Sequence, residues 1–474
     1  MKDPISKRES LIVVFLIFVC FHFLYSQTTW TGAAMDSDWD NSGNWDMGVP
    51  GAMDDVIIPS GSTVNIMSGT NAVAQKVTIT ESILSVHTGA SLTVDGEMSI
   101  GIAFDITGSW IANYASIMVL NSSSRGINLS YESTFTNFGT MNINNSSTDG
   151  LHFANFGSGS SFINYGELNF VNNGGEAIEL RNISTFRNTV DGRINISLDA
   201  DEEAIQIFTS GAHFINEGEL LIHSAGKSGI DMEYGTSFTN EATGYILISN
   251  YGSIDRTINH AIENEGGIFI NNGSIEVIGG QYSNIGIELD FLGSFPGIFI
   301  NNGYLSIENI RGEGIDIRSI CTFTNNLLIN MGLRGSSEDH AVLLVRLGGN
   351  FLNAACGVLN MTSEDSISIL MDGELTNNGV MTTIYTGEHN IEGIFTNNGE
   401  IATPDGNFNL AMGSNPLMGT GSVTMGAIPR QPSNACLGIP IPAIGTWTLG
   451  ILLLMFFIVG VVWIRDIKRT SMTL

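Results

Sequence analysis

Positive charge is scarce in this sequence. Its 474 residues contain 18 Lys and Arg against 47 Asp and Glu, which gives a formal net charge of −29. Because such a surface repels phosphate groups and anionic lipids, we expect no nucleic-acid partner. Charged residues of both signs make up only 14% of the chain, so Asn, Gly, Ser and Thr must supply most of its polar surface.

Cysteine is also scarce, with four residues in the chain. Cys20 lies in the N-terminal apolar run, and the remaining Cys321, Cys356 and Cys436 are odd in number, so they predict no disulfide framework. Cys321 and Cys356 occupy different points of the repeat described below, and we expect them to be unpaired or buried. No His accompanies them at the spacing of a zinc site, so they predict no metal centre.

Helical periodicity is nearly absent outside the two ends of the chain, which favours an all-β fold. The sequence also lacks a Ser/His/Asp constellation, a phosphate-binding loop and a Cys/His metal pattern. It therefore identifies no catalytic residue and no cofactor.

A repeat fills most of the chain. It follows the pattern Phe-x-Asn-x-Gly-x-Φ-x-Φ, where Φ is apolar, and residues 162–170 show it in full. Its first residue recurs between Phe135 and Phe395 with a mean spacing of about 26 residues, which indicates a solenoid of stacked coils. The pairs that we expect to form a structural ladder are Phe162 and Asn164, Phe186 and Asn188, Phe214 and Asn216, Phe238 and Asn240, Phe269 and Asn271, Phe299 and Asn301, and Phe323 and Asn325.

The chemistry of one repeat predicts a parallel β-helix. A second apolar strand of the form Ala/Gly-Ile-x-Φ precedes each Phe, as at 177–180 and 229–232, so each coil should contain two strands. The Gly after each Asn should supply the positive φ of a tight turn. The Asn then lies in the bend, where its amide can bond the equivalent Asn of the next coil in a stacked ladder.

This pattern resembles the right-handed parallel β-helix of pectate lyases, tail-spikes and secreted adhesins. The resemblance concerns the fold of residues 76–412 and no catalytic motif. It implies an all-β, right-handed parallel β-helix with coils of roughly 26 residues.

Two segments precede the coils. Residues 1–27 combine a basic start with an apolar run from Leu11 to Leu24, which is the pattern of a secretory signal peptide. Residues 28–75 follow the pattern W-x-G…W-x-x-x-x-N-W…P…D-x-V-x-I, which resembles an opening module of Bacteroidetes-type secreted surface proteins. The resemblance implies a β-rich module that caps the first coil.

Two more segments follow the coils. Residues 413–440 are rich in Gly, Pro, Ser and Asn and predict a linker. Residues 441–474 contain an uncharged run at 447–464, long enough for one transmembrane helix, and a basic tail that favours the cytoplasmic side. This end resembles the IPTL family of C-terminal sorting signals, which implies an exported envelope protein, either anchored by a single membrane span or released to the cell surface after cleavage. The residues that carry the resemblance are Ile441, Pro442, Trp447 and the basic tail from Arg465, whereas Ala443, Thr446 and Thr448 depart from the family pattern.

Candidate binding residues are few. Acidic residues cluster at 199–203, 338–340 and 364–365, where loops should fall. Asp199, Asp201 and Glu202 could hold a calcium ion if their loop folds back. We expect no acidic cluster to recur at one repeat position in adjacent coils with a basic partner, as a carbohydrate cleft would need.

These observations favour a non-catalytic cell-surface protein, adhesin-like or structural. Its partners would be extracellular glycans or other surface components, bound by weak contacts that add up along the rod. The alternative is a polysaccharide-cleaving lyase or glycosidase on the same fold. A row of carboxylates with Arg or Lys on one exposed sheet would favour the enzyme, and rows of Asn, Ser and Thr would favour the adhesin.

Overall fold

The computed structural model describes residues 26–433, except 98–100, 155–158, 199–201, 253–258, 281–282, 284, 334–340, 363–365, 371 and 427–428. Residues 1–25 of the expected signal peptide, the expected span at 447–464 and the expected sorting residues Ile441, Pro442, Trp447 and Arg465 lie outside this part. In the described part, no helix is long and apolar enough to cross a membrane.

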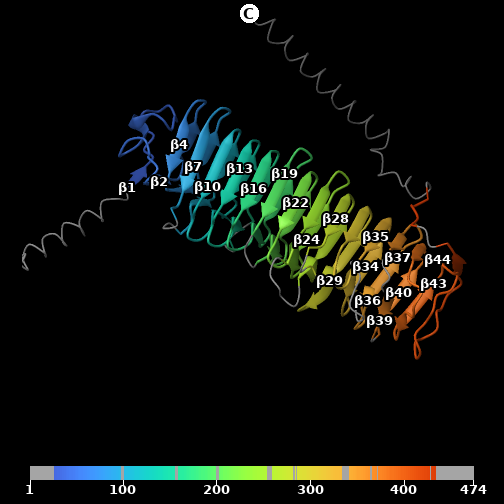
Figure 1. Ribbon diagram of the computed structural model, residues 1–474. Helices are drawn as coiled ribbons and strands as arrows, with labels where there is room; N and C mark the ends of the chain where they lie inside the picture. Colours follow the sequence, from blue (N-terminus) through green and yellow to red (C-terminus); the bar gives the residue numbers. More distant parts are fainter. Residues whose placement is uncertain are drawn as a thin grey trace, which may run out of the picture. The chain divides into compact units, whose positions relative to one another are not determined.

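The described strands form a right-handed-type parallel β-solenoid of about 15 coils (Figure 1). Each complete coil contributes one strand to each of three parallel sheets. Sheet 1 comprises β1 (Ser26–Thr29), β2 (Asp54–Ile58), β5 (Lys76–Thr80), β8 (Phe104–Thr107), β11 (Ile127–Ser130), β14 (Leu151–Phe153), β17 (Ile178–Arg181), β20 (Ile205–Phe208), β23 (Ile230–Glu233), β26 (His260–Glu265), β29 (Ile285–Leu292), β33 (Ile315–Ile317), β36 (Ala341–Val345), β39 (Ser366–Ile369) and β42 (Asn390–Ile391), with β30 (Phe295–Pro296) pairing antiparallel to β29.

Sheets 2 and 3 follow sheet 1 within each coil. Sheet 2 comprises β3 (Thr63–Ile66), β6 (Ile83–Val86), β9 (Trp110–Asn113), β12 (Thr134–Asn137), β15 (Ser161–Asn164), β18 (Thr185–Asn188), β21 (His213–Asn216), β24 (Ser237–Asn240), β27 (Ile268–Asn271), β31 (Ile298–Asn301), β34 (Thr322–Asn325), β37 (Asn350–Asn353), β40 (Glu374–Asn377) and β43 (Ile394–Asn397). Sheet 3 comprises β4 (Asn71–Ala74), β7 (Ser91–Asp95), β10 (Ser116–Leu120), β13 (Thr140–Asn144), β16 (Glu167–Val171), β19 (Arg193–Ser197), β22 (Glu219–Ser224), β25 (Tyr245–Ser249), β28 (Ser274–Ile278), β32 (Tyr304–Glu308), β35 (Leu328–Gly332), β38 (Val358–Met361), β41 (Val380–Thr383), β44 (Glu400–Thr403) and β45 (Ser422–Met425).

The coil has three strands, and the expected two-strand coil is therefore wrong. The stretch 162–170 that defines the repeat is divided between β15 and β16, with a bend at Tyr165 and Gly166. Its Phe and Asn belong to sheet 2, and its following apolar residues belong to sheet 3. Inward and outward side chains alternate in both β15 and β16. Interpreting 162–170 as one strand therefore identified the inward residues correctly but missed the bend between the two strands.

The phenylalanines of sheet 2 stack through the core. Phe214 and Phe238 are in register, and their ring centroids are 4.7 Å apart with an interplanar angle of 6°. The same 4.7 Å spacing joins Phe238, Phe269, Phe299 and Phe323 in turn. All of these rings are fully buried, so the stack is the apolar axis of the solenoid.

The asparagines of sheet 2 form a continuous ladder beside that stack. Asn216 donates through Nδ2 to Oδ1 of Asn240 at 2.8 Å, and Asn240 donates to Asn271 at 2.8 Å. Each amide both donates and accepts, so the buried groups satisfy one another from coil to coil. The ladder also includes Asn113, which the pattern missed because Ile111 stands where the repeat has Phe. Its members are Asn113, Asn137, Asn164, Asn188, Asn216, Asn240, Asn271, Asn301, Asn325, Asn353, Asn377 and Asn397.

Close packing accounts for the glycine that follows most ladder asparagines. We expected a positive φ at this position, but Gly166, Gly244 and Gly303 are not among the described glycines with positive φ. A Cβ added at Gly303 would instead lie 2.0 Å from the carbonyl oxygen of Gly273 in the preceding coil. A corner of this kind has no room for a side chain, whereas the corners at Ala115 and Leu327 hold a side chain at the equivalent position.

Residues 28–75 do not form the distinct capping module that we expected. Strands β2, β3 and β4 already make the first complete coil. The segment before them adds an incomplete coil, because β1 pairs with β2 and Asp38 bridges to Asn65 in β3. This segment contains the short 3-10 helix η1 (Ser42–Asn44) and a cluster of tryptophans with ring centroids 4.9 Å apart in each contact, namely Trp30, Trp39 and Trp45.

The solenoid also extends further toward the C-terminus than we expected. The predicted linker begins at Gly413, but β45 lies beyond that point and pairs in parallel with β44. Arg430 ion-pairs with Glu400 at 2.6 Å. The Gly- and Ser-rich composition that suggested a linker is that of the tight corners of a last coil.

The two cysteines within the coils differ. Cys321 is buried and free. Cys356 is only half-buried and is disulfide-bonded, so the expectation that it would be unpaired or buried is wrong.

Candidate functional site

The outer face of sheet 1 carries a column of polar, mostly acidic side chains. In β17, β20 and β23, the apolar residues on either side of the middle position belong to the core, so the middle side chain points outward. The strand register places these middle residues above one another in successive coils. We call this set the acidic column: His152, Glu179, Gln206, Asp231, Glu263, Glu288 and Asp316.

Most of the acidic column is buried although it lies outside the apolar core. The exposed fraction is 3% for Glu179, 4% for Asp231, 3% for Glu288 and 0% for Asp316. Burying an ionised carboxylate is costly unless it is paired, protonated or hydrogen-bonded. The column must therefore obtain cations, protons or donors from its surroundings.

Our expectation that no acidic cluster would recur with a basic partner is wrong. The acidic residues occupy the x of the Ala/Gly-Ile-x-Φ strand, a motif that we had used only to place the strand. Following this x down the repeats would have found the column. The residues at x are, in sequence order, Glu179, Gln206, Asp231, Glu288 and Asp316, which are five of the seven members of the acidic column.

A half-exposed second column lies two residues further along the same strands and supplies basic partners. Arg318 contacts Glu288 at 2.5 Å and Asp316 at 2.8 Å, and Arg346 contacts Asp316 at 2.7 Å. Asp316 is therefore held between two guanidinium groups. We call this set the rim column, and the two columns together the acidic strip. The rim column consists of Arg181, Phe208, Glu233, Glu265, Asp290, Arg318 and Arg346.

The centre of the acidic column is less well compensated. Asp231 accepts a hydrogen bond from Gln206 on Oδ2 at 3.2 Å, whereas its Oδ1 is buried without a hydrogen-bond partner among the described residues. Burial, followed by the charges of Glu263 and Glu203, raises the pKa of Asp231 well above its ordinary value. Lys227 is the nearby cation: it is paired directly with Glu203, and its charge also acts on Asp231 and Glu263 at longer range.

A group around His152 marks the N-terminal end of the acidic column. Asn128 donates to Asp105 through Nδ2, so its Oδ1 accepts from Nδ1 of His152 at 3.0 Å. The other ring nitrogen of His152 then faces Oε2 of Glu179 at 3.1 Å. Burial raises the pKa of Glu179 to about 7, although Arg181 contacts Oε1 of this carboxylate and opposes the shift, and burial lowers the pKa of His152 to about 3.

Further titratable side chains adjoin this pair. Asp149, His152 and Glu179 each offer one ligand atom, and these atoms lie within 4.8 Å of one another, as metal ligands could. Arg125 compensates Asp149 at 3.0 Å. Burial, and then a hydrogen bond with Asp149, raises the pKa of Glu176 to about 8. In this group, Arg125 compensates the charge of Asp149, and the raised pKa values of Glu176 and Glu179 favour their neutral forms.

Aromatic side chains border the centre of the acidic strip. Phe208 packs edge to face on Tyr234 with centroids 5.4 Å apart. A Cβ at Gly235 would lie 3.1 Å from the ring of Phe295, which comes from the hairpin of β29 and β30. Three of these rings reach solvent, with exposed fractions of 36% for Tyr234, 37% for Phe291 and 42% for Phe295. We call Phe208, Tyr234, Phe291 and Phe295 the aromatic edge.

The residues that we expected to bind calcium are only partly described. Asp199 and Asp201 lie outside the described residues, as do the clusters at 338–340 and 364–365. Glu202 is exposed and lies near Glu176 and Glu203, with one ligand atom of each within 4.8 Å of the others. The ladder residues lie inside the solenoid, away from this surface.

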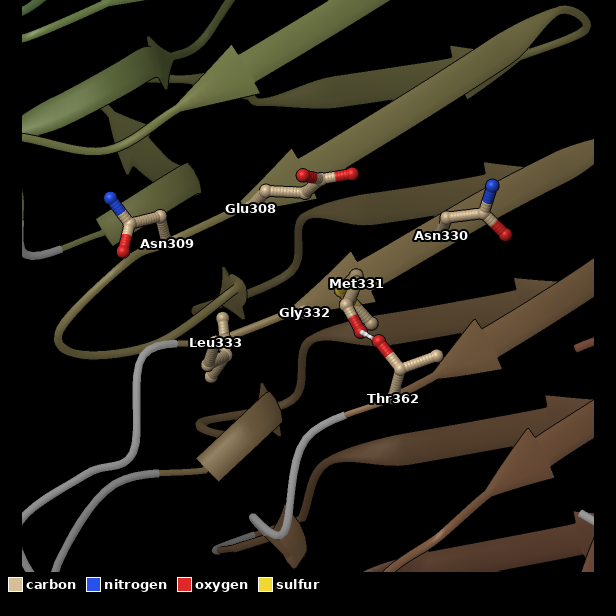
Figure 2. Close-up of a pocket in the computed structure, with 7 residues that line it drawn as sticks. All are labelled: Glu308, Asn309, Asn330, Met331, Gly332, Leu333 and Thr362. Atoms are coloured by element: carbon tan, nitrogen blue, oxygen red, sulfur yellow. Dashed lines mark hydrogen bonds between the residues drawn. The ribbon is translucent and has the colours of Figure 1, made fainter.

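A hollow of about 410 Å³ lies elsewhere, at the ends of β32 and β35 on sheet 3 (Figure 2). One carboxylate lines it, and Thr362 closes one side by donating to the carbonyl of Met331 at 3.1 Å. The hollow has fewer charged groups than the acidic strip, since Glu308 is its only charged lining residue. The lining residues are Glu308, Asn309, Asn330, Met331, Gly332, Leu333 and Thr362.

The fold and this surface define a parallel β-solenoid with an acidic strip and an aromatic edge on one sheet. Residues 29–250 match the model of a domain of unknown function, DUF8693. The match covers less than half of the chain and includes Glu179 and Asp231, but it ends before Glu263 and Glu288. No curated protein and no solved structure matches the chain.

Proposed function

We propose that this protein is an exported surface protein that binds glycan chains through the acidic strip and the aromatic edge. The observation that carries the proposal is that carboxylates, guanidinium groups and exposed aromatic rings lie on one face, in the coils from β17 to β33: Arg181 stacks on Phe208, and Arg318 contacts Glu288. Carboxylates and Arg form charge-assisted hydrogen bonds with hydroxyl groups, and aromatic rings cover the apolar faces of sugars.

The repeat of the solenoid supports a polymeric ligand. Equivalent side chains recur at the strand spacing of roughly 4.8 Å, which is comparable to the length of one sugar unit. A chain lying along the strip would meet similar groups in each coil, and weak contacts would add up to useful affinity. The excess of carboxylates favours neutral glycans over uronic-acid polymers.

Rows of neutral polar side chains also favour binding. On the outer face of sheet 3, Asn169 donates to Asn142 at 3.0 Å and Asn195 donates to Asn169 at 2.7 Å. Such rows of amides are the pattern that we associated with an adhesin. They provide additional hydrogen-bonding surface without any group suited to acid or base chemistry.

The test is a glycan array with the purified full-length protein, its Tyr234→Ala and Phe295→Ala variants, and a control. The control is Tyr114→Ala, which removes a ring of similar exposure (44%) that stacks on Phe138 at 4.9 Å, away from sheet 1. We expect the first two variants to lose tenfold or more in affinity for neutral glycans and the control to match the wild type. Equal loss in all three variants, or no bound glycan at all, would reject the proposal.

Cleavage of the bound glycan is the second candidate function, and two observations favour it. The row of carboxylates with Arg partners on sheet 1 is the pattern that we associated with an enzyme. Asp231 and Glu263 are register partners in adjacent coils, which brings two carboxylates of the kind that glycosidases use close together. A reducing-end assay on glycans that bind the protein tests this candidate. Release of new ends that Asp231→Asn abolishes, with binding intact, would establish an enzyme; binding without new ends would leave the adhesin.

Export and anchoring belong to the same proposal and depend on the sequence. The signal peptide at 1–27 and the IPTL-like tail at 441–474 support a rod held outside the cytoplasm or released to the surface. Protease added to intact cells should digest the coils and spare cytoplasmic markers. Mass spectrometry of the surface form would then separate the two fates, because peptides beyond Trp447 remain only if the span is kept.

A further inference from the structure

One histidine in the acidic strip lies between two carboxylates. The ring of His260 is 2% exposed, and its Nδ1 lies 3.0 Å from Oε2 of Glu263. Its Nε2 lies 3.2 Å from Oε2 of Glu288, which comes from the next coil. The three side chains each offer one ligand atom, and these atoms lie within 4.8 Å of one another.

The surroundings determine which nitrogen of His260 is free. Ser228 donates to Oε2 of Glu263 at 2.8 Å and so holds that carboxylate beside Nδ1. With Nδ1–H donated to Glu263, the neutral ring presents its lone pair at Nε2. A carboxylate on the far nitrogen is the usual support for a histidine that binds a metal through the other nitrogen.

Nε2 of His260 and Oε2 of Glu288 are close enough for an ion pair but make no well-aligned hydrogen bond among the residues that the structure describes, although both side chains are at least 97% buried. Burial lowers the pKa of His260, but Glu263 and Glu288 outweigh burial and raise this pKa to about 9, so a metal ion at Nε2 would have to displace a proton. Two ligands at the bond lengths of zinc, at angles from 90° to tetrahedral, are roughly 3.0–3.4 Å apart. The observed 3.2 Å therefore matches neighbouring ligands of one ion.

We propose that Nε2 of His260 and Oε2 of Glu288 bind a divalent transition-metal ion, with Glu263 orienting the histidine from its other nitrogen. Imidazole nitrogen with carboxylate oxygen suits zinc or manganese, whereas calcium takes oxygen ligands only. Arg318 holds the second oxygen of Glu288 at 2.5 Å and so fixes its orientation.

The test uses the purified full-length protein after treatment with a chelator. Titration with Zn²⁺, Mn²⁺ and Ca²⁺, each alone, should show about one tight Zn²⁺ or Mn²⁺ ion per chain. Co²⁺ should give visible absorption bands of a site with nitrogen and oxygen ligands. We expect Glu288→Gln, which keeps the size of the side chain, to weaken binding at least tenfold, and Glu263→Gln to weaken it about 10- to 100-fold.

A matched control separates this site from general acidity. Glu308→Gln removes a carboxylate at the end of β32, outside the acidic strip, and should bind the ion like the wild type. Circular dichroism checks that each variant folds. If the folded wild type binds none of the three ions, or if Glu288→Gln binds as tightly as the wild type, a proton occupies the site and His260 is an imidazolium between two carboxylates. Loss of metal with glycan binding retained would leave the proposed function standing.

Discussion

Two columns of polar side chains run along this solenoid with the same coil-to-coil spacing, and they solve opposite problems. On sheet 2, each amide of the Asn ladder donates to the next, as from Asn216 to Asn240 at 2.8 Å, so every buried group is satisfied by its neighbours. On sheet 1, the acidic column stacks carboxylates such as Asp231 and Glu263, which only accept when ionised and repel one another. Self-complementary stacking gives a scaffold, whereas stacking of like charges leaves a demand for protons, cations or ligands.

The comparison predicts where mutations act. Changes on sheet 2 should lower stability by a similar amount at every pH, because neither Phe nor Asn titrates. Changes in the acidic column should alter the dependence of stability on pH or ions. The predictions below run from the largest expected effect to the smallest.

Phe238→Ala should destabilise the protein most. The ring is fully buried and stacks on two neighbours at 4.7 Å, so its loss leaves a cavity and should cost about 3–5 kcal/mol. The free energy of unfolding from denaturant titration measures this. A denaturation midpoint equal to that of the wild type would show that the Phe stack does not hold the coils together.

Much of sheet 2 could be predicted from the sequence because its interactions are local in the repeat. One motif shows both that Phe and Asn point into the solenoid and that they stack on the same residues of the next coil. Their register could therefore be predicted from the spacing of the motif. The corner at Gly166 was harder, since the reason for glycine is a carbonyl oxygen one coil away. A contact between coils is not visible within one repeat.

The acidic strip was missed for a different reason. Glu179 and Asp231 are separated by the length of two coils, and one glutamine stands between them in the column, so no acidic run appears in the sequence. Their burial depends on side chains and loops around sheet 1, which vary in length from coil to coil. The repeat gave no signal for the aromatic edge, because Phe295 reaches Gly235 through a hairpin that, among the described residues, occurs in one coil only.

Glu179→Gln should change how stability depends on pH. The pKa of Glu179 is raised to about 7, chiefly by burial, so between its unfolded pKa near 4.5 and pH 7 the folded protein binds a proton that the unfolded chain does not. This contribution is present in full below pH 4.5 and is lost as pH rises through 7. A shift of this size corresponds to about 3 kcal/mol.

Denaturant titrations of the wild type and of Glu179→Gln between pH 4.5 and 8 measure this effect. The variant should lose less stability than the wild type as pH rises across that range. Phe238→Ala is the control, because it should lower the whole curve without changing its slope. Parallel curves for the wild type and Glu179→Gln would mean that Glu179 is ionised in the folded protein.

Gly303→Ala should destabilise the corner between β31 and β32 by about 3 kcal/mol, the upper end of the usual cost of overpacking. The added Cβ would lie 2.0 Å from a backbone oxygen, which cannot move as the end of a flexible side chain could. Gly101→Ala is the matched control, because nothing lies within 4 Å of its added Cβ. It should leave stability unchanged or raise it by about 0.4–1 kcal/mol. A Gly303→Ala variant as stable as Gly101→Ala would show that the corner accommodates a Cβ and that close packing does not require glycine there.

Asn240→Ala tests whether the ladder stabilises through buried amides or through stacking in general. It removes the acceptor of Asn216 and the donor to Asn271. Asn216 keeps a carbonyl acceptor at 3.1 Å on Gly218, so we expect a loss of about 1–3 kcal/mol and not the sum of two orphaned groups.

The chain contains a matched control for this last variant. Asn302 belongs to an outer row in which it donates to Asn272 at 2.9 Å and accepts from Asn326 at 2.7 Å, but these amides are exposed. Water replaces the lost bonds there, so Asn302→Ala should change the free energy of unfolding by no more than about 0.5 kcal/mol. Both variants remove an amide that donates to one neighbour and accepts from another, but Asn240 is buried and also donates to the carbonyls of Gly244 and Ser274. If both variants lost the same free energy of unfolding, burial of the amides would not explain the stability of the Asn ladder. The Asn ladder and the acidic column would then differ only because the carboxylates carry charge.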